Sequence, residues 1–418
     1  MVERLFFYNF IKMNYIFFDP EPQRANLLPF TFTRPVANLR VGIITIDEKW
    51  ARLLGISSYS YKTQDYLQAK FPLTFGSANT FINGSICPNF KLIEQVKGLK
   101  SGQGLYNGST LIAVCLNQQE AINFDPIDAT FEKIDSHSND YMQLNYSYDI
   151  FSKNGEAIEA DYALITNGRV SQPIPEGNRV MNPERIFIEE GAIINFSILN
   201  ASTGSIYIGK DTEIMEGSKV RGPFALCDHA GLKMDAKIYG PTTVGPYCKV
   251  GGEVSNAVFY AYSNKGHDGF VGNSVIGEWV NMGADTNNSN LKNTYDEVKL
   301  WNYRSEKFEK TGLTFCGLMM ADHAKCGINT MFNTGTVVGV GANIFGTGFP
   351  RNFIPGFSWG GPQGFETFDL NKFYKTAKAV CKRRNVAFSD VDKDLLKAVF
   401  EQEMKFRFWE EKKEIGGQ

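Results

Sequence analysis

Residues 208–250 read IGKDTEIMEGSKVRGPFALCDHAGLKMDAKIYGPTTVGPYCKV, and this stretch decides the fold. A branched or long apolar residue recurs at every sixth position. The series consists of Ile208, Ile214, Val220, Leu226, Leu232, Ile238, Val244 and Val250. Neither the period of a helix nor the alternation of a strand produces this spacing. It is typical of a hexapeptide β-helix, in which three steps close a turn and stacked turns bury an apolar column.

The six-residue spacing continues on both sides of this stretch. Further members are Ile188 and Ile194, then Phe270, Ile276 and Met282, and finally Met320, Cys326, Phe332, Val338 and Ile344. We therefore expect a coil over residues 181–355, with interruptions near residues 254–268 and 287–315. An ordinary β-sandwich with chance spacing is the alternative, and eight consecutive matches disfavour it.

Composition limits the class of protein. The 418 residues exceed what one compact core accommodates, so several domains are expected. A net charge of −2 gives no electrostatic basis for binding nucleic acid or an acidic membrane. The seven cysteines are scattered without a CxxC pair, which favours a reducing cytoplasm over a disulfide framework or a zinc ribbon. No apolar run reaches the roughly 18 residues of a membrane span.

Residue composition and the pattern of apolar residues divide the chain into four segments. Residues 13–165 are predicted to form an α/β domain, with strands at 15–18 and 110–116 and a helix at 90–99. Residues 166–180 are predicted to be a linker, residues 181–355 the β-helix, and residues 356–418 a helical segment that packs on the coil or a neighbouring subunit. The opening residues 1–12 are expected to be an upstream tail, and not a signal peptide, with Met13 as a plausible true start.

His267 is the first candidate for catalysis. It lies where the six-residue series breaks, and such breaks place loops on the surface of a coil. Acyl transfer to an amine needs a base that takes up a proton near neutral pH, which histidine supplies. A lone histidine is more often structural. A γ-class carbonic anhydrase is disfavoured because no two histidines are five residues apart, so no metal site is predicted.

The residues after His267 carry a family resemblance. The sequence GHDGFVGNSVIG at 266–277, with NMGA at 281–284 and Asn290 further on, resembles the acetyltransferase half of the bifunctional N-acetylglucosamine-1-phosphate uridylyltransferase/glucosamine-1-phosphate acetyltransferases, the GlmU family. The resemblance implies that His267 is the general base. It implies that Phe270 and Asn281 contact a sugar phosphate and that Asn290 lies near the thioester of acetyl-CoA. It also implies a left-handed coil and a homotrimer.

The sequence departs from that family at three points. Phe270 stands where the family usually has Tyr, Asp285 stands where it usually has Gly, and no basic pair precedes the motif. Lys265, Lys292 and Lys299 are the candidates to supply positive charge to the substrate.

A second resemblance lies in the N-terminal domain. RANLLPFTFTRP at residues 24–35 resembles the start of sugar nucleotidyltransferases, with Arg24 and Arg34 at the basic positions. DPEPQ at residues 19–23 replaces the glycine-rich loop, and each proline removes an N–H donor that could bind phosphate. Asn83, before Gly84, stands where the family has an aspartate for Mg²⁺, and a neutral amide is a weaker ligand. Mg²⁺ is the cofactor expected if this site is active.

Two hypotheses follow from the sequence. The first is a cytoplasmic transferase of sugar-nucleotide metabolism that acts on a small-molecule sugar phosphate and nucleotide. In it, acetyl-CoA is the acyl donor, and nucleotidyl transfer is an open second activity. The alternative is a non-catalytic protein that binds a sugar nucleotide or serves as a trimeric scaffold.

Overall fold

The computed structural model describes residues 13–126 and 131–410, so the predicted tail at residues 1–12 lies outside the described residues. Contacts within the chain separate two compact units. The first contains the described residues up to Glu21 together with Pro35–Asn38 and Ile46–Gln143. The second contains Pro22–Arg34, Leu39–Thr45 and the described chain from Leu144 onward. The segment boundaries 13–165, 166–180, 181–355 and 356–418 stay predictions.

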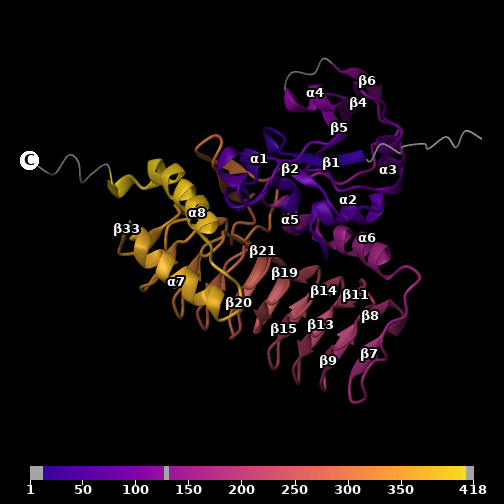
Figure 1. Ribbon diagram of the computed structural model, residues 1–418. Coiled ribbons are helices and arrows are strands. Elements are labelled where there is room, and N and C mark those ends of the chain that lie inside the picture. Colours follow the sequence, from indigo (N-terminus) through magenta and orange to yellow (C-terminus); the bar gives the residue numbers. More distant parts are fainter. Residues whose placement is uncertain (1–12, 127–130, 411–418) are drawn as a thin grey trace, which may run out of the picture. The chain divides into compact units, whose positions relative to one another are not determined.

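The first unit is built on a mixed six-stranded sheet with the order β2-β1-β3-β5-β4-β6 (Figure 1). Its strands are β1 Met13–Phe18, β2 Ser60–Lys62, β3 Ala78–Asn83, β4 Gln103–Asn107, β5 Thr110–Asn117 and β6 Glu132–Asp135. β1 runs parallel to β2 and β3, whereas β5 is antiparallel to β3 and β4. β5 is buried at six consecutive positions, as expected for a strand that is covered on both faces.

Short helices complete this unit. They are α2 Ile46–Leu54, α3 Phe90–Lys97 and α4 Gln118–Ile122, with 3₁₀ turns η2 Val36–Asn38 and η3 Asp65–Leu67. α3 begins where the Asn89 side chain accepts a hydrogen bond from the backbone of Leu92, which satisfies one of the free N–H groups of a helix start. The truncated Rossmann-like domain is confirmed, and so are the strands predicted at 15–18 and 110–116 and the helix at 90–99.

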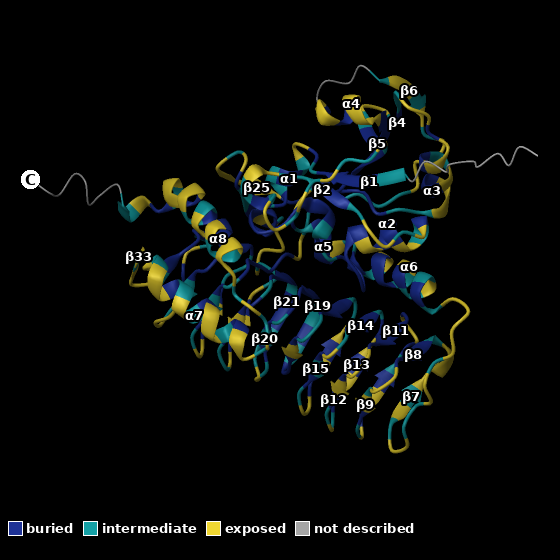
Figure 2. Ribbon diagram, in the orientation of Figure 1, coloured by how far each residue is buried: buried dark blue, intermediate teal, exposed yellow. Residues whose placement is uncertain are grey.

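The second unit is dominated by a parallel coil. Adjacent turns place Ile208 beside Leu226, Ile214 beside Leu232, and Val220 beside Ile238. The eight residues of the six-residue series are all at most 2% exposed and belong to one apolar cluster. Along many coil strands in Figure 2 buried positions lie beside exposed ones, as in β13 Lys219–Arg221, where one buried residue stands between two exposed residues. The sequence therefore predicted the column correctly because each step repeats a local pattern.

The coil strands form two long ladders of 13 and 10 strands and a short third one. The strands of the 13-stranded ladder are β7 Arg179–Met181, β8 Ile186–Ile188, β10 Ile198–Asn200, β11 Ile206–Ile208, β13 Lys219–Arg221, β14 Phe224–Leu226, β16 Lys237–Tyr239, β17 Thr242–Val244, β19 Glu253–Phe259, β21 Phe270–Ile276, β26 Leu318–Met320, β29 Thr336–Val338 and β31 Phe353–Ile354. Those of the 10-stranded ladder are β9 Ile193–Ile194, β12 Glu213–Ile214, β15 Gly231–Leu232, β18 Lys249–Val250, β20 Asn264–Lys265, β22 Asn281–Met282, β27 Lys325–Cys326, β30 Asn343–Ile344, β32 Ser358–Gly361 and β33 Gly364–Thr367. β23 Asn287–Asn288 pairs with β28 Met331–Phe332.

The prediction that Phe270 belongs to the apolar column is wrong. Val271 pairs with Val254 and is fully buried, whereas Phe270 pairs with Glu253 and is only half-buried. The cause is a shortened step, because Ile276 follows Val271 by only five residues, so a count of six back from Ile276 reaches Phe270. The coil continues through the predicted interruption at residues 254–268, and its main protrusion is at 289–317.

That protrusion contains an antiparallel hairpin, formed by β24 Lys299–Asn302 and β25 Lys307–Lys310. Beyond the coil, α7 Leu370–Lys382 and α8 Asp390–Gln402 confirm the predicted C-terminal helices, and η5 Met404–Phe406 follows them. Phe373 of α7 packs edge-on against Phe357 at 5.0 Å between ring centroids. The C-terminal helices therefore bury apolar faces against the end of the coil.

Shorter elements of the second unit lie before the coil or, in the case of η4, between its first two strands. They are α1 Gln23–Asn26, η1 Phe30–Phe32, α5 Asp149–Ser152, α6 Asn154–Thr166 and η4 Pro183–Arg185. Phe30 packs on Tyr260 with centroids 5.8 Å apart, so the segment at residues 22–34 is bound to the coil wall.

Candidate functional site

The loop that carries His267 is fixed from inside the coil. Lys265 occupies the inward position that pairs with Val250 in the preceding turn, and it is 1% exposed. Its Nζ donates hydrogen bonds to the backbone oxygens of His267 at 2.5 Å and Asp268 at 2.9 Å. Burial lowers the pKa of Lys265 to about 8, while the nearby Asp268 and Asp285 oppose this shift. A buried ammonium group thus fixes the backbone of the loop.

The His267 side chain is exposed to solvent. Behind it, Gly269 adopts φ +109°, and a Cβ there would lie 2.3 Å from the backbone oxygen of Thr286. The backbone of Asp285 also donates to the Asp268 oxygen at 3.1 Å. The loop is therefore fixed against the next turn while its imidazole remains free to meet a ligand.

Phe270 and Asn290 are brought together over Gly272. A Cβ on Gly272 would lie 2.4 Å from the Phe270 ring and 2.7 Å from the Asn290 amide nitrogen, so only glycine fits beneath them. The Asn290 amide donates to the Asn273 side chain at 2.7 Å. Phe270 and Asn290, which the sequence predicted to contact the substrates, thus lie together on the coil surface. Asn273, which holds Asn290, was not indicated by the motif.

Asn281 and Lys292 lie elsewhere on the second unit. Asn281 is exposed on β22, in the ladder position between Asn264 and Lys325. Lys292 donates from Nζ to the backbone oxygen of Glu297 at 2.8 Å, which leaves two of its three donors for other partners. The substrate-binding roles of both residues stay predictions.

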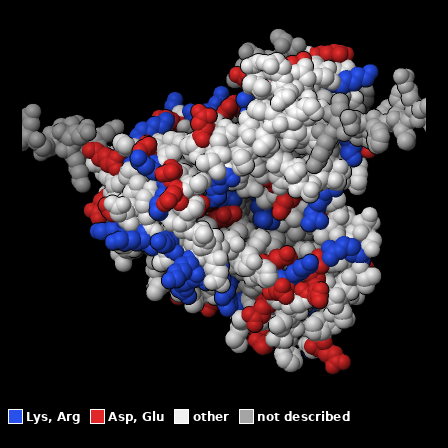
Figure 3. All heavy atoms as spheres, viewed as in Figure 1, with Lys and Arg blue, Asp and Glu red and all other residues white. Residues whose placement is uncertain are grey.

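A basic surface lies beside the strand that leads to Lys265. Figure 3 shows Lys and Arg side chains gathered over α7. Arg384, just beyond that helix, donates to the Asn264 side chain at 3.0 Å. Burial lowers the pKa of Lys249 on the adjacent strand, and the neighbouring charges of Arg384 and Lys233 lower it further. This cluster of like charges favours anionic ligands near β20.

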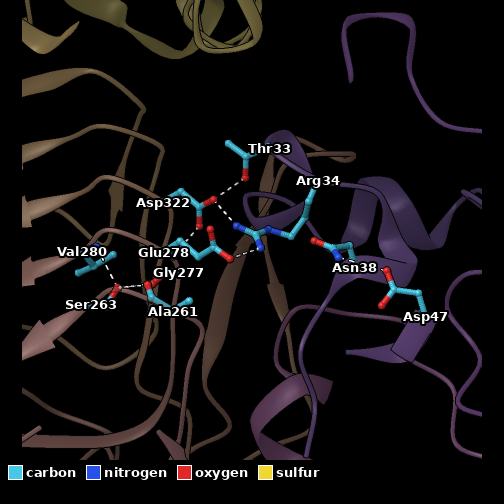
Figure 4. A network of polar contacts seen from close by, with 10 residues as sticks. All are labelled: Thr33, Arg34, Asn38, Asp47, Ala261, Ser263, Gly277, Glu278, Val280 and Asp322. Atoms are coloured by element: carbon cyan, nitrogen blue, oxygen red, sulfur yellow. Dashed lines mark hydrogen bonds and ion pairs between the residues drawn. The ribbon is translucent and has the colours of Figure 1, made fainter. Parts of the chain in front are cut away.

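Arg34 forms a buried ionic network with two turns of the coil (Figure 4). Its Nη2 lies 2.5 Å from the Asp322 carboxylate, and its Nη1 lies 2.8 Å from that of Glu278. Asp322 also accepts hydrogen bonds from the Thr33 hydroxyl at 2.6 Å and from the Glu278 backbone at 2.7 Å. The two carboxylates raise the pKa of Arg34 although its burial opposes this, and the guanidinium is also 5.1 Å from the centre of the Tyr260 ring.

Asp322 and Glu278 were missed at the sequence level. Each follows an inward residue by two positions, Met320 for Asp322 and Ile276 for Glu278, and those two residues are paired in adjacent turns. Alignment of the turns would have placed both acids on one line of the coil surface. The repeat alone would not have shown that these acids pair with Arg34, because that arginine lies in a segment far away in the sequence.

Arg24 lies in the same segment as Arg34 and is buried. Its Nη2 donates to the backbone oxygen of Thr31 at 3.0 Å, and the Thr31 hydroxyl donates to the Arg24 oxygen at 2.8 Å. These bonds close the loop at residues 24–31 on itself. The role of Arg24 and Arg34 in nucleotide binding stays a prediction.

Asn83 ends β3 in the first unit, and its side-chain oxygen is fully occupied by local donors. The amide nitrogen donates to the Leu111 oxygen at 2.9 Å, and the amide oxygen accepts from the backbone and hydroxyl of Ser85 at 3.0 and 2.7 Å. Both lone pairs of that oxygen are in use, so Asn83 does not fit Mg²⁺ as a ligand. A Cβ at Gly84 would lie 2.9 Å from the Ala37 backbone, which explains the glycine.

Within residues 13–126 and 131–410, no group of three or more His, Cys, Asp or Glu is placed to hold a metal ion. The same ranges contain no helix with the length and apolar character needed to cross a bilayer.

The fold and these motifs together resemble a sugar nucleotidyltransferase domain joined to a hexapeptide coil. Consistent with this, the family model described as sugar nucleotidyl transferase matches residues 15–170. The chain is 30% identical over 144 residues to the bifunctional sugar-1-phosphate nucleotidylyltransferase/acetyltransferase of Sulfurisphaera tokodaii, which covers 34% of this chain and 35% of that protein. It is 31% identical over 108 residues to the bifunctional protein GlmU of Trichodesmium erythraeum, covering 25% and 22%.

A third relative is the uncharacterized acetyltransferase YaiX of Escherichia coli, 25% identical over 143 residues, with 34% of this chain and 61% of that protein covered. The matches therefore span less than two thirds of the length of each relative. A solved structure, the polySia-specific acetyltransferase NeuO, matches 50% of this chain and 94% of its own at 10% identity and a TM-score of 0.17. The resemblance to the GlmU family that the sequence indicated is confirmed by the curated relatives.

Proposed function

We propose that this protein is a transferase of sugar-nucleotide metabolism whose coil transfers an acyl group from acetyl-CoA to the amine of a sugar phosphate. The observation that carries the proposal is an exposed imidazole, His267, on a loop whose backbone is fixed from inside by Lys265. A catalytic group held by a rigid support loses little entropy when the substrate arrives.

The reaction follows from general acid–base chemistry. As the amine attacks the thioester carbonyl, a C–N bond forms and His267 removes the proton from nitrogen. The C–S bond then breaks, and the protonated imidazole returns the proton to the thiolate of CoA. In this proposal Phe270 and Asn281 contact the sugar phosphate, and Asn290, held by Asn273, lies near the thioester.

Lys265 has a different part in this proposal from the direct substrate contact that the sequence suggested. Its ammonium group is buried and donates to two backbone carbonyls, so it acts as a positioning residue for the loop. Anionic substrates are attracted by the cluster of Lys249, Lys233 and Arg384 instead. The protein is further proposed to be a homotrimer, in keeping with the family resemblance, and sedimentation equilibrium tests this.

The test is release of free thiol from acetyl-CoA in the presence of a panel of amino-sugar 1-phosphates. We expect release with at least one acceptor and its loss in His267→Ala, by about 100-fold or more, the usual contribution of a general base. His137→Ala is the matched control, because that histidine is also exposed but belongs to the first unit. Equal turnover in His267→Ala and the wild type would refute the assignment.

A second candidate function is specific to the N-terminal domain, namely nucleotide binding without nucleotidyl transfer. The saturated amide of Asn83 and the ion pairs of Arg34 favour it. We expect calorimetry to detect nucleoside triphosphate binding, and no pyrophosphate release with Mg²⁺ and a sugar 1-phosphate. Pyrophosphate release by the wild-type protein would contradict this candidate.

A further inference from the structure

A pocket of about 730 Å³ opens between the protruding hairpin, the end of the coil and the C-terminal residues. Its volume lies in the range of small-molecule sites, about 300–1,000 Å³. The lining residues are mainly aromatic and cationic, and they include Trp301, Phe308 and Phe353 together with Lys299 and Arg351. The acyl-transfer proposal does not use this pocket, although Lys292 and Lys299, which the sequence suggested as sources of positive charge, both line it.

The apolar wall is an arrangement of flat rings. Trp301 stacks on Phe353 with centroids 4.2 Å apart and planes within 10°. Phe308 meets Trp301 edge-on at 5.4 Å and is 43% exposed, and Phe408 on the opposite chain segment is 39% exposed. Large apolar rings left open to solvent beside a cavity are suited to a planar ligand, because stacking removes their surface from water.

The charge of the pocket has one sign. Three cations line it, and no acidic residue does. Among the described residues, no ion pair is recorded for Lys299 or Arg351, and the latter lies 4.7 Å above the Phe408 ring. Lys299 also faces Lys310 across the hairpin, but Lys310 is paired with the Glu297 carboxylate at 3.3 Å, whereas no such pair is recorded for Lys299 in the described part of the chain. The pocket thus has positive charge that a bound anion would neutralise.

We propose that this pocket binds a phosphorylated nucleoside, with the base against the aromatic wall and the phosphate between Lys299 and Arg351. Flat aromatic rings and unpaired cations in one cavity match the two parts of such a ligand. Two sources share this chemistry, the adenosine 3′,5′-bisphosphate portion of a CoA thioester and the nucleoside diphosphate of a sugar nucleotide. Binding here does not depend on acyl transfer at His267, so the two proposals fail separately.

The test is titration of the full-length protein with adenosine 3′,5′-bisphosphate, with UDP and with adenosine, followed by calorimetry and tryptophan fluorescence. We expect one phosphorylated nucleoside to bind and adenosine to bind at least about tenfold more weakly, since each charge-assisted hydrogen bond contributes that much. Preference for the bisphosphate identifies a CoA-type ligand, and preference for UDP identifies a sugar nucleotide.

Variants locate the binding. Lys299→Gln and Arg351→Gln are both exposed substitutions, and each should weaken binding about tenfold. Lys310→Gln is the matched control, because Lys310 is the cross-strand neighbour of Lys299 but does not line the pocket. Phe308→Ala should weaken binding of the base and reduce the fluorescence change. No binding of either phosphorylated nucleoside at millimolar concentration, or affinity unchanged in Lys299→Gln and Arg351→Gln, would overturn the proposal.

Discussion

Substitution of Arg34 by methionine should destabilise the second unit, because the guanidinium neutralises carboxylates that have little access to water. The side chains of Arg34 and Asp322 are 6% and 5% exposed, whereas that of Glu278 is 29% exposed. Loss of one partner from a buried pair costs about 3–5 kcal/mol. Asp322 retains hydrogen bonds from Thr33 and from the Glu278 backbone, so we expect a loss near the lower value, about 3 kcal/mol.

The assay is urea unfolding of the wild type, Arg34→Met, Asp322→Asn and the double variant. Asparagine at position 322 keeps an oxygen for the Glu278 backbone but removes the charge that Arg34 neutralises. The double variant should therefore be more stable than the sum of the two single losses predicts, with a coupling of about 1–3 kcal/mol. Arg304→Met is the control, because Arg304 is exposed on the hairpin turn and should change stability by less than about 0.5 kcal/mol.

One result would refute this reasoning. If Arg34→Met unfolds at the same urea concentration as the wild type but loses nucleotide binding, the guanidinium serves a ligand and not the coil. The residue would then have the role that the sequence motif suggested, and the ion pairs with Asp322 and Glu278 would contribute nothing measurable.

Three further predictions concern the core, the end of the coil and the N-terminal strand. Leu232→Ala should cost about 3–5 kcal/mol because the side chain is fully buried in the column, whereas Met234→Ala, 64% exposed two residues on, should be nearly neutral in the same melts. Burial raises the pKa of Glu403 to about 7 from 4.5, so its contribution to stability is greatest below pH 4.5 and is lost as pH rises to 7. Glu403→Gln should therefore remove up to about 3 kcal/mol of this pH dependence from unfolding curves measured between pH 4.5 and 8, and an unchanged curve would contradict the assignment. Asn83→Asp should replace a donor to the Leu111 oxygen by a carboxylate, cost about 1–3 kcal/mol in the same unfolding assay, and create no Mg²⁺-dependent activity; a gain of such activity would show a latent metal site.

The coil was predictable because its information is local. Each six-residue step contains one apolar residue and several turn residues, so the column from Ile208 to Val250 follows from spacing alone. The register failed at Phe270 because the step from Val271 to Ile276 has five residues, so a count of six back from Ile276 reaches Phe270 instead of the inward Val271. A shortened step still places an apolar residue inward, but a search for a fixed six-residue period does not detect it.

The candidate site was predictable in part. The motif around His267 indicated Phe270 and Asn290, which the fold brings to one glycine. The partners of Arg34 were not predictable from the motif, since Asp322 is 288 residues away and is joined to the arginine only by the folded coil. Contacts between side chains that are distant in sequence follow no fixed spacing, so a sequence pattern does not reveal them. For this reason the motif suggested a nucleotide as the partner of Arg34, whereas the structure shows carboxylates of the protein itself.

The buried cation Arg34 solves a problem that the apolar column creates. Successive turns of a coil are nearly alike, so aliphatic contacts alone do not determine at which turn a loop attaches. A buried charge is stable only where its partners are, and misplacement would leave it unpaired at a cost of several kcal/mol. Arg34 finds its carboxylates only at the turns that contain Glu278 and Asp322. This polar exception to the repeat therefore specifies where the segment at residues 22–34 joins a scaffold that is otherwise uniform.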